Sequence, residues 1–451
     1  MPLSWLTTHA EIVLLSALVI AAAAFLLQQR RSPQSTAAWL LFLIVAPYFA
    51  IPFFVGLAVR KRANGPEALK LLPVSDQPPA CHVDAMLRAY GLPGASDGHA
   101  FTLHDTPQSA RAALFDLIAG AKHEIDAMFY IVARDDVGRA FVAALTEKAR
   151  QGVAVRLIID RLGTLNPPWQ SLNALSDAGG EVRFFSPLVQ RPMRGHLNLR
   201  NHRKIMVVDQ SVAFGGGMNI GHEYLGDGPD VWTDLAFTLR GPAVQSCAGV
   251  FASDWRGTGG TADDPVIAPP PGDGKTIAQL VPSGPDLRHD GLHDTLINAI
   301  HRADTRVWIA TPYFLPTDTL SEALSVAGRR GVDVCIMLPR RSNQRIADFA
   351  RGAYLRELQA ARCKILLFKP GMLHAKAGII DQSAYVGSVN FDVRSMLLNF
   401  EDTLFVHDPT SVAQLADWFT GHTPSCDVGI ANAGAMRRIG EGLFRIGAPI
   451  L

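Results

Sequence analysis

The sequence carries little charge for its length. Of its 451 residues, 18% are charged and 48% are hydrophobic, and the formal net charge at pH 7 is only +1. A chain with so small a net charge lacks the broad basic field by which proteins collect nucleic acid, so no nucleic-acid partner is expected. The length exceeds that of a usual single domain, so two globular units are expected.

Cysteines and metal-binding patterns are also sparse. The five cysteines contain no Cys-x-x-Cys pair, which argues against a disulfide framework and favours buried thiols in a reducing compartment. They are Cys81, Cys247, Cys335, Cys363 and Cys426. No His-Glu-x-x-His or similar ligand spacing occurs. The sequence therefore predicts no metal site and no cofactor.

Two long apolar runs stand at the start of the chain. Residues 12–27 carry no charge over sixteen positions, and the apolar residues 37–59 extend over twenty-three. At about 1.5 Å per residue, the second run is long enough for a hydrocarbon core about 30 Å thick, and the first is somewhat short. Together they predict a membrane anchor over 1–62 in the form of a transmembrane helical hairpin.

Cationic residues beside these runs predict the membrane face. Arg30 and Arg31 follow the first run, and three cations at 60–62 follow the second. Lys and Arg favour the cytoplasmic side, and the second run is followed by one cation more than the first. This small excess predicts a multi-pass protein of the cell (inner or plasma) membrane with a cytoplasmic body. Pro47 and Pro52 leave an alternative open, in which the second run enters the membrane and returns to the same side.

The rest of the chain contains a repeat. A polar connector over 63–100 leads to two similar halves, 101–256 and 276–428, which a Gly- and Pro-rich linker at 257–275 separates. Each half shows a strand, a helix and two more strands, at 127–132, 137–150, 155–160 and 180–185, and at 307–310, 320–330, 334–338 and 363–368. This pattern predicts an α/β duplication. The tail, 429–451, mixes arginine with apolar residues and is open to two interpretations, an interfacial membrane segment or an ordinary docked terminus.

A histidine motif follows the last of these strands in each half. Both motifs have the pattern His-x-Lys-x4-Asp, with His202, Lys204 and Asp209 in the first half and His374, Lys376 and Asp381 in the second. The residues between lysine and aspartate are apolar, so each motif is expected on a buried strand. Alternation along a strand would place its histidine and lysine on one face.

Two such motifs suit chemistry on a phosphodiester. Its anionic oxygens repel nucleophiles, and two lysines can neutralise that charge with help from Asn219 and Asn390, which follow the motifs. One histidine can attack phosphorus while the other protonates the leaving alkoxide and then deprotonates the incoming alcohol. The spacing from aspartate to asparagine is ten residues in the first half and nine in the second, which makes the role of Asn390 less secure.

Four carboxylates complete the set of candidate residues. Asp234 and Glu401 stand in apolar stretches downstream of the first and second motif, where each can orient a histidine. Asp209 and Asp381 belong to the catalytic motifs, but they fall at the strand ends, where structural roles at turns or between lobes are at least as well supported by the sequence.

The paired motifs are the signature of the phospholipase D superfamily, and the flanking sequence resembles the bacterial cardiolipin synthase family. The segments that carry this resemblance are NHRKIMVVD at 201–209, ATPYFLPTD at 310–318, RGVDVCIMLPR at 330–340 and NFDVRSMLLNFE at 390–401. The resemblance extends over nearly the whole chain, including the apolar segments at its start. It implies two phospholipase D-type lobes, each a mixed sheet flanked by helices, related by a pseudo-twofold axis.

The resemblance also implies a reaction and a substrate. A phosphatidyl group would pass from one phosphatidylglycerol to another through a phosphohistidine, giving cardiolipin and glycerol without a metal. The residues themselves leave alternatives open: hydrolysis, another alcohol or lipid acceptor, a nuclease, or a catalytically silent membrane scaffold. A membrane anchor and near-neutral charge argue against the nuclease, and two intact motifs argue against the scaffold.

Overall fold

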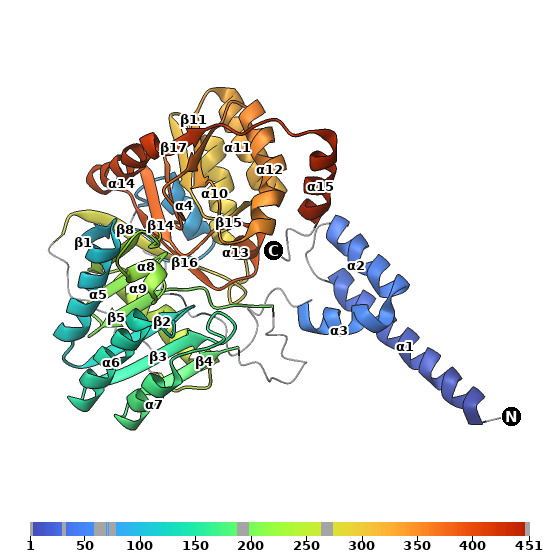
Figure 1. Cartoon of the computed structure of the whole chain (residues 1–451), viewed down its shortest axis with the longest axis horizontal. Coiled ribbons are helices and arrows are strands. Elements are labelled where there is room, and N and C mark those ends of the chain that lie inside the picture. The colour runs from blue at the N-terminus through green and yellow to red at the C-terminus, as the bar shows by residue number, and fades with distance from the viewer. Residues whose placement is uncertain are drawn as a thin grey trace. The chain divides into compact units, whose positions relative to one another are not determined.

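The structure is a computed structural model that describes residues 3–28, 33–57, 69, 71, 78–186, 198–262 and 274–446. Backbone contacts divide the chain into two compact units (Figure 1). The smaller comprises residues 1–60 and 186–199, and the larger comprises residues 61–185 and 200–451.

The smaller unit contains three apolar helices, α1 (Leu3–Gln28), α2 (Pro33–Val45) and α3 (Pro47–Leu57). Within the described residues, one helix, at 8–28, is long and apolar enough to cross a membrane. The second apolar run is divided at Ala46 into helices of 13 and 11 residues, each short of the roughly 20 that a span needs. Pro47 explains the division, because proline lacks an N–H donor and disfavours helical geometry in the residue before it. The predicted hairpin of two spanning helices is therefore not seen in the described part of this unit.

The larger unit is built on a 15-stranded mixed sheet whose order is β17-β12-β11-β9-β13-β14-β16-β8-β1-β7-β6-β5-β2-β3-β4. Its first-lobe strands are β1 (Ser96–His104), β2 (Glu124–Phe129), β3 (Ala154–Asp160), β4 (Glu181–Phe185), β5 (Ile205–Val208), β6 (Val212–Gly216) and β7 (Ala236–Arg240). Its second-lobe strands are β8 (Thr276–Ser283), β9 (Arg306–Ala310), β11 (Asp333–Pro339), β12 (Lys364–Phe368), β13 (Ala377–Ile380), β14 (Ser383–Gly387), β16 (Glu401–Val406) and β17 (Cys426–Val428). The short strands β10 (Phe314–Leu315) and β15 (Phe391–Asp392) form a separate parallel pair.

The strand order shows the duplication directly. The antiparallel pair β1–β8 joins the two lobes. Outward from this pair, β7, β6, β5, β2, β3 and β4 repeat the order and pairing directions of β16, β14, β13, β9, β11 and β12. The predicted α/β duplication and mixed sheet are confirmed, and the predicted strands correspond to β2, β3, β4, β9, β11 and β12.

Helices cover both faces of this sheet in each lobe. The first lobe carries α5 (Pro107–Gly120), α6 (Asp136–Arg150) and α7 (Trp169–Asp177) side by side, with the short α8 (His222–Leu225), and α9 (Val244–Gly257) packs against β2, β5 and β6 (Figure 1). The second lobe repeats this with α10 (Gly291–Arg302), α11 (Asp318–Arg330), α12 (Arg345–Ala360), the short α13 (Val393–Leu397) and α14 (Pro409–His422). Between the anchor and β1, α4 (His82–Ala89) lies within the stretch predicted as a connector.

Local signals explain the two helices that were predicted, α6 and α11. The side chain of Asp135 accepts a hydrogen bond from the Gly138 N–H and caps α6, and Thr317 caps α11 through the Leu320 N–H. Gly331 ends α11 with a left-handed φ of 95°, which glycine adopts without steric cost. The apolar side of each helix is buried against the sheet.

The tail forms α15 (Ala435–Ile446), which packs against α12. Glu441 is fully buried there and pairs with Arg356 and with Arg437. Met436 and Ile439 are exposed. The tail is thus a docked helix, and binding of its exposed side to a membrane stays a prediction.

A buried cation joins the two lobes beside the histidine motifs. Arg203 is fully buried, and its guanidinium donates to Asp254 in α9 at 2.9 Å and to Asp286 after β8 at 3.0 Å. Its Nε also donates to the backbone carbonyl of Glu401 at 3.1 Å. Burial alone would lower the pKa of Arg203, but the two carboxylates outweigh it and raise that pKa. The charge therefore stays fixed at the lobe interface.

Removing this cation should destabilise the protein strongly. Arg203→Met leaves two aspartates buried without their partner, so the free energy of unfolding should fall by about 3–5 kcal/mol. Urea denaturation of the detergent-solubilised chain measures the change. Arg150→Met, which breaks an exposed pair with Glu147, is the matched control and should cost less than about 1 kcal/mol. Equal stability losses in the two variants would contradict the role of Arg203.

Candidate functional site

The histidine motifs begin just before two equivalent strands. The apolar residues between lysine and aspartate form β5 and β13, as predicted. His202 and Lys204 precede β5, and His374 and Lys376 precede β13, so the prediction that these side chains stand on the strand itself is wrong. The reason is that the backbone of each histidine pairs with the opposite lobe.

Two short parallel backbone bridges cross the lobe interface at the histidines. In one, the His202 N–H donates to the Phe400 carbonyl at 2.9 Å and the Phe400 N–H donates to the Arg200 carbonyl at 2.9 Å. In the other, the His374 N–H donates to the Thr233 carbonyl at 2.7 Å. Phe400 and Thr233 immediately precede Glu401 and Asp234. Each histidine is therefore fixed beside the carboxylate of the other lobe.

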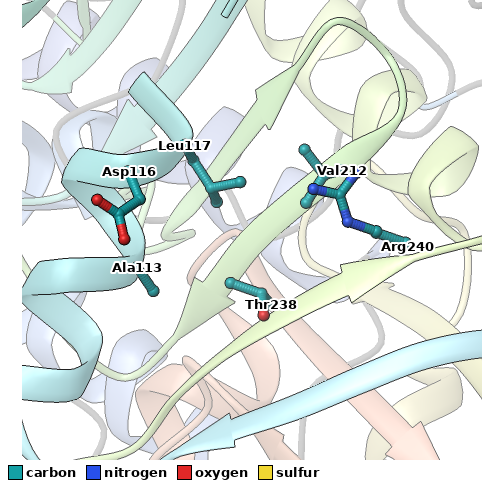
Figure 2. Close-up of a pocket in the computed structure, with 6 residues that line it drawn as sticks. All are labelled: Ala113, Asp116, Leu117, Val212, Thr238 and Arg240. Atoms are coloured by element: carbon teal, nitrogen blue, oxygen red, sulfur yellow. The ribbon is translucent and has the colours of Figure 1, made fainter. Parts of the chain in front are cut away.

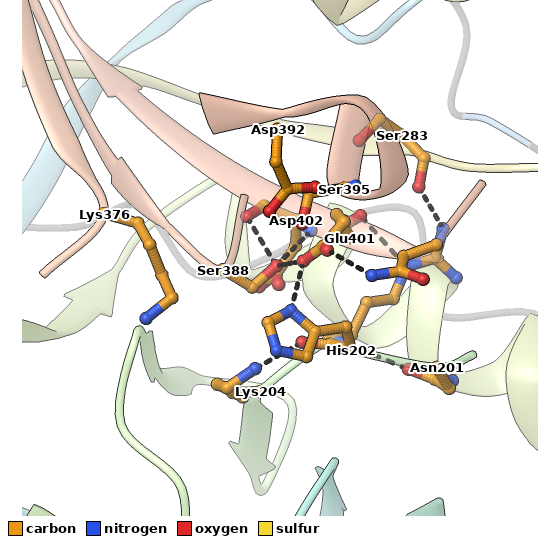
Figure 3. Close-up of polar contacts among 12 residues, drawn as sticks. Asn201, His202, Lys204, Ser283, Lys376, Ser388, Asp392, Ser395, Glu401 and Asp402 are labelled. Carbon is orange, nitrogen blue, oxygen red and sulfur yellow. Dashed lines mark hydrogen bonds and ion pairs between the residues drawn. The ribbon is translucent and has the colours of Figure 1, made fainter. Parts of the chain in front are cut away.

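The side chains follow this crossed arrangement. His202 Nδ1 lies 2.8 Å from Glu401 Oε2 (Figure 3), and His374 Nδ1 lies 2.6 Å from Asp234 Oδ2. Asp234 and Glu401 thus each contact a histidine, as the sequence suggested, but it is the histidine of the other half and not the one upstream in the same half. An ionised carboxylate only accepts hydrogen bonds, so each Nδ1 carries the proton and each Nε2 is unprotonated.

The lysines are buried against the histidines. Lys204 Nζ donates to the His202 carbonyl at 2.6 Å. Lys376 Nζ lies 3.2 Å from His374 Nε2 and contacts the His374 carbonyl, and it is 3.9 Å from Asp234. Lys376 Nζ is also 2.6 Å from His374 Nδ1. Because Asp234 accepts the Nδ1 proton, this last approach is a contact and not a second hydrogen bond.

Burial controls the charge states of the four central groups. It lowers the pKa of His202 to about 4 and that of His374 to about 3, against the opposing pull of Glu401 and Asp234. Burial also lowers the pKa of Lys204 to about 8 and that of Lys376 to about 7. Each lysine further lowers the pKa of the histidine in the other lobe, so the two halves act electrostatically as one site.

The two carboxylates are held in different ways. Glu401 accepts a hydrogen bond from Ser388 Oγ at 2.5 Å (Figure 3) and another from Asn399 Nδ2 at 3.2 Å. The equivalent of Ser388 in the first half is Gly217, where a Cβ would lie 2.2 Å from Asp234 Oδ1. The shorter carboxylate, Asp234, therefore faces a glycine, and the longer one, Glu401, faces a serine. The Gly216-Gly217 and Gly387-Ser388 pairs were visible in the sequence, but their contact with the carboxylates was not predicted.

Asn219 and Asn390 occupy equivalent positions after β6 and β14. The one-residue difference lies in the hairpin turns, which have three residues between Val208 and Val212 and two between Ile380 and Ser383. The difference in turn length therefore does not shift Asn219 relative to Asn390 when the two halves are aligned. Asn219 Oδ1 accepts from the Ile131 N–H at 3.2 Å, whereas the buried Asn390 Oδ1 has no hydrogen-bond partner among the described residues.

Asp209 and Asp381 lie at the other end of their strands. Asp209 accepts hydrogen bonds from three successive backbone N–H groups, those of residues 122–124, at 2.7–2.9 Å. Asp381 accepts from the N–H groups of residues 304–306 at 2.9–3.0 Å. These bonds contribute to lowering the pKa of both carboxyls against the opposing effect of burial. The contacts are those of carboxylates that fix the turns before β2 and β9.

Aromatic residues that the sequence did not single out surround the histidines. The Tyr130 ring lies 4.9 Å from His202, centroid to centroid. Tyr224 and Trp232 lie 5.2 and 5.1 Å from His374. These contacts bury the imidazoles and leave the two sides of the site unlike each other.

A shallow pocket of about 270 Å³ lies elsewhere in the first lobe (Figure 2). It is lined by Ala113, Asp116, Leu117, Val212, Thr238 and Arg240, none of which belongs to the histidine site. Within the described residues, no three His, Cys, Asp or Glu side chains are arranged to hold a metal ion.

Comparison with known proteins identifies the family. A sequence profile described as cardiolipin synthase, PLD-like domain, matches residues 114–255 and 296–423, one segment in each lobe. The chain belongs to this family. It is 32% identical to the cardiolipin synthase of Geobacillus thermodenitrificans, over 90% of this chain and 86% of that protein. It is 33% identical to the cardiolipin synthase of Geobacillus kaustophilus, over 97% and 93%.

A solved structure supports the fold. The phosphatidylserine synthase of Haemophilus influenzae superposes with a TM-score of 0.62, covering 78% of this chain and 95% of that one, at 14% identity. At this identity the likeness concerns the fold alone. The resemblance to the cardiolipin synthase family drawn from the motifs is confirmed.

The lysine pKa values predict how activity depends on pH. Lys376 and Lys204 lose their protons near pH 7 and 8, and a neutral lysine no longer attracts the phosphodiester. The kcat/KM, which reports the free protein, should therefore fall as pH rises through 7–8. A bound phosphodiester anion stabilises the ammonium groups, so kcat should fall only at higher pH. Phosphatidyl transfer assayed between pH 5 and 10 tests this, and a kcat/KM that rises from pH 7 to 9 would contradict it.

Proposed function

We propose that this protein is a membrane-anchored cardiolipin synthase that transfers a phosphatidyl group from one phosphatidylglycerol to another. The observation that carries the proposal is the crossed site, in which two histidines, two lysines and two carboxylates from both lobes converge. Membership of the cardiolipin synthase family supports the choice of substrate.

The first half of the reaction forms a phosphohistidine. His202 is neutral at physiological pH, and its Nε2 can attack phosphorus while Glu401 stabilises the positive charge that develops on the ring. The phosphorus–oxygen bond to the glycerol headgroup breaks, and His374 protonates the departing alkoxide. Negative charge on the bound phosphodiester raises the pKa of His374 and so favours the proton that it must donate. We assign the nucleophile to His202, whose side chain is 12% exposed against 5% for His374.

The second half reverses these roles at phosphorus. His374, now neutral, deprotonates a glycerol hydroxyl of the acceptor phosphatidylglycerol, and that oxygen displaces His202 to give cardiolipin. Lys204 and Lys376, with Asn219 and Asn390, neutralise charge on the non-bridging oxygens in both halves. Asp209 and Asp381 act only through the turns that they hold.

Product analysis tests this function. Purified full-length protein in phosphatidylglycerol micelles should release cardiolipin and glycerol in equal amounts, which lipid chromatography and a glycerol assay measure. His374→Ala should reduce turnover by about 10²–10⁴-fold, because the acid–base group is lost. With phosphate-labelled donor, that variant should still carry label on His202, and His202→Ala should carry none. Phosphatidic acid as the only lipid product would replace transfer with hydrolysis, and label on His374 would reverse the assignment.

The anchor suits lipid substrates, and we propose a specific topology for it. The helix at 8–28 spans the bilayer, and α2 and α3 enter and leave on one side, as their break at Ala46 and exposed aromatics such as Tyr48 and Phe49 support. The cationic residues that follow the two runs would then share the cytoplasmic face with the large unit.

Cysteine labelling tests this topology. A single cysteine introduced at Ser35 should react with a membrane-impermeant maleimide only in inside-out vesicles. A cysteine at Thr8 should react only from the outside and serves as the matched control. Labelling at position 35 from the outside alone would instead support two full spans.

A further inference from the structure

Two arginines lie beside His202 that the phosphodiester site does not use. Arg200 precedes the first motif by two residues, and Arg394 stands in α13. The Phe400 N–H donates to the Arg200 carbonyl at 2.9 Å, and the Asn399 N–H donates to the Arg394 carbonyl at 3.0 Å. The loop from α13 to Glu401 therefore brings both arginines to the same side of the site.

One nitrogen of the Arg200 guanidinium, Nη1, has no hydrogen-bond partner among the described residues. The Nε and Nη2 of Arg200 donate to Asp160 at 2.7–3.2 Å, but its Nη1 is buried. The residue is only 4% exposed. A buried donor of this kind is costly unless a ligand accepts from it.

The charges of Arg200 and Arg394 lie close enough to affect each other. Burial lowers the pKa of Arg394, and the like charge of Arg200 lowers it further, whereas Tyr130, Asp392 and Asp160 oppose this. Arg394 and Tyr130 are only partly buried, so a ligand can reach them. The Tyr130 ring is in contact with His202, and Tyr130 also interacts electrostatically with Arg394, so Tyr130 connects this cationic side with the proposed nucleophile.

The other side of the site lacks these charges. The bridges at Phe400 and Thr233 align Arg200 with Met372, whose carbonyl accepts from Thr233 as that of Arg200 accepts from Phe400. Asn219 and Asn390 are equivalent, and four residues after them stand Glu223 and Arg394. Two cations on the His202 side thus correspond to a methionine and a glutamate on the His374 side.

We propose that Arg200 and Arg394, with Tyr130, form a second anion subsite that binds the phosphodiester of the acceptor lipid. This inference rests on the proposed function. An acceptor phosphatidylglycerol keeps its own phosphate, and in the product a three-carbon glycerol bridge separates the two. The second phosphate must therefore be bound close to the first, and Lys204 and Lys376 are already occupied by the first. The lipid acceptor gains its advantage over water and neutral alcohols at this subsite.

A partition experiment tests the subsite. Ethanol and phosphatidylglycerol compete for the same phosphohistidine, so the ratio of cardiolipin to phosphatidylethanol reports acceptor choice alone. Arg394→Gln should lower this ratio about tenfold, as expected for the loss of one charged contact, while phosphatidylethanol formation stays within about twofold. Arg394→Lys should recover part of the ratio. Arg329→Gln, an exposed site on α11, is the control and should leave the ratio unchanged.

The other outcomes are equally decisive. An unchanged ratio in Arg394→Gln, or a parallel loss of both products, would overturn the subsite while leaving the proposed function intact. If the wild type makes phosphatidylethanol but no cardiolipin, the proposed function has failed. The subsite is then judged with soluble acceptors, because glycerol phosphate should outcompete glycerol in the wild type and lose that advantage in Arg394→Gln. Equilibrium dialysis with inorganic phosphate needs no turnover, and weaker binding should appear in Arg394→Gln but not in Arg329→Gln.

Discussion

The site depends on two short backbone bridges that cross between the lobes. Each ties a histidine segment of one lobe to the residue just before the carboxylate of the other, at Phe400 and at Thr233. Neither lobe alone contains a histidine with its carboxylate partner. Both lobes must therefore be assembled before the two imidazoles are oriented. The contacts of the buried Arg203 stabilise the same lobe interface.

Burial of this interface sets the chemistry as well as the geometry. An imidazole that is desolvated stays neutral and nucleophilic, and a carboxylate against its Nδ1 stabilises the cation that forms on attack. The lysines are desolvated by the same contacts, so their ammonium groups are less stable than in water until an anion arrives. A phosphodiester anion would stabilise both ammonium groups. In the proposed mechanism, substrate binding by the lysines and the neutral state of His202 therefore depend on the same burial.

Much of the fold could be predicted from the sequence because its strands and helices correspond to local patterns of apolar and polar residues. Short apolar runs identified strands such as β3 and β11, the stretches between strands identified the helices α6 and α11, and the repetition of this pattern identified the duplication. The anchor was predicted less well, because the hydropathy of 37–59 favoured a second full span and the interruption at Pro47 entered only as an alternative. The sequence also supplied the six motif residues as candidates, but it did not reveal two properties of their arrangement. The placement of histidines before their strands and the crossed carboxylate pairing both depend on contacts across the lobe interface, between residues such as His202 and Glu401 that lie 199 positions apart.

The duplicated lobes are not chemically equivalent, because the residues around His202 differ from the corresponding residues around His374. Glu401 is supported by Ser388 where Asp234 faces Gly217, and the His202 side carries Arg200 and Arg394 where the His374 side carries Met372 and Glu223. In a symmetric site, either histidine could attack and either lipid could serve as the donor. In the transfer proposed above, the two lipids are identical, and these differences give the protein a way to separate a donor side from an acceptor side. Substitutions at the paired positions around a symmetric catalytic centre are the simplest way for a duplicated fold to do so.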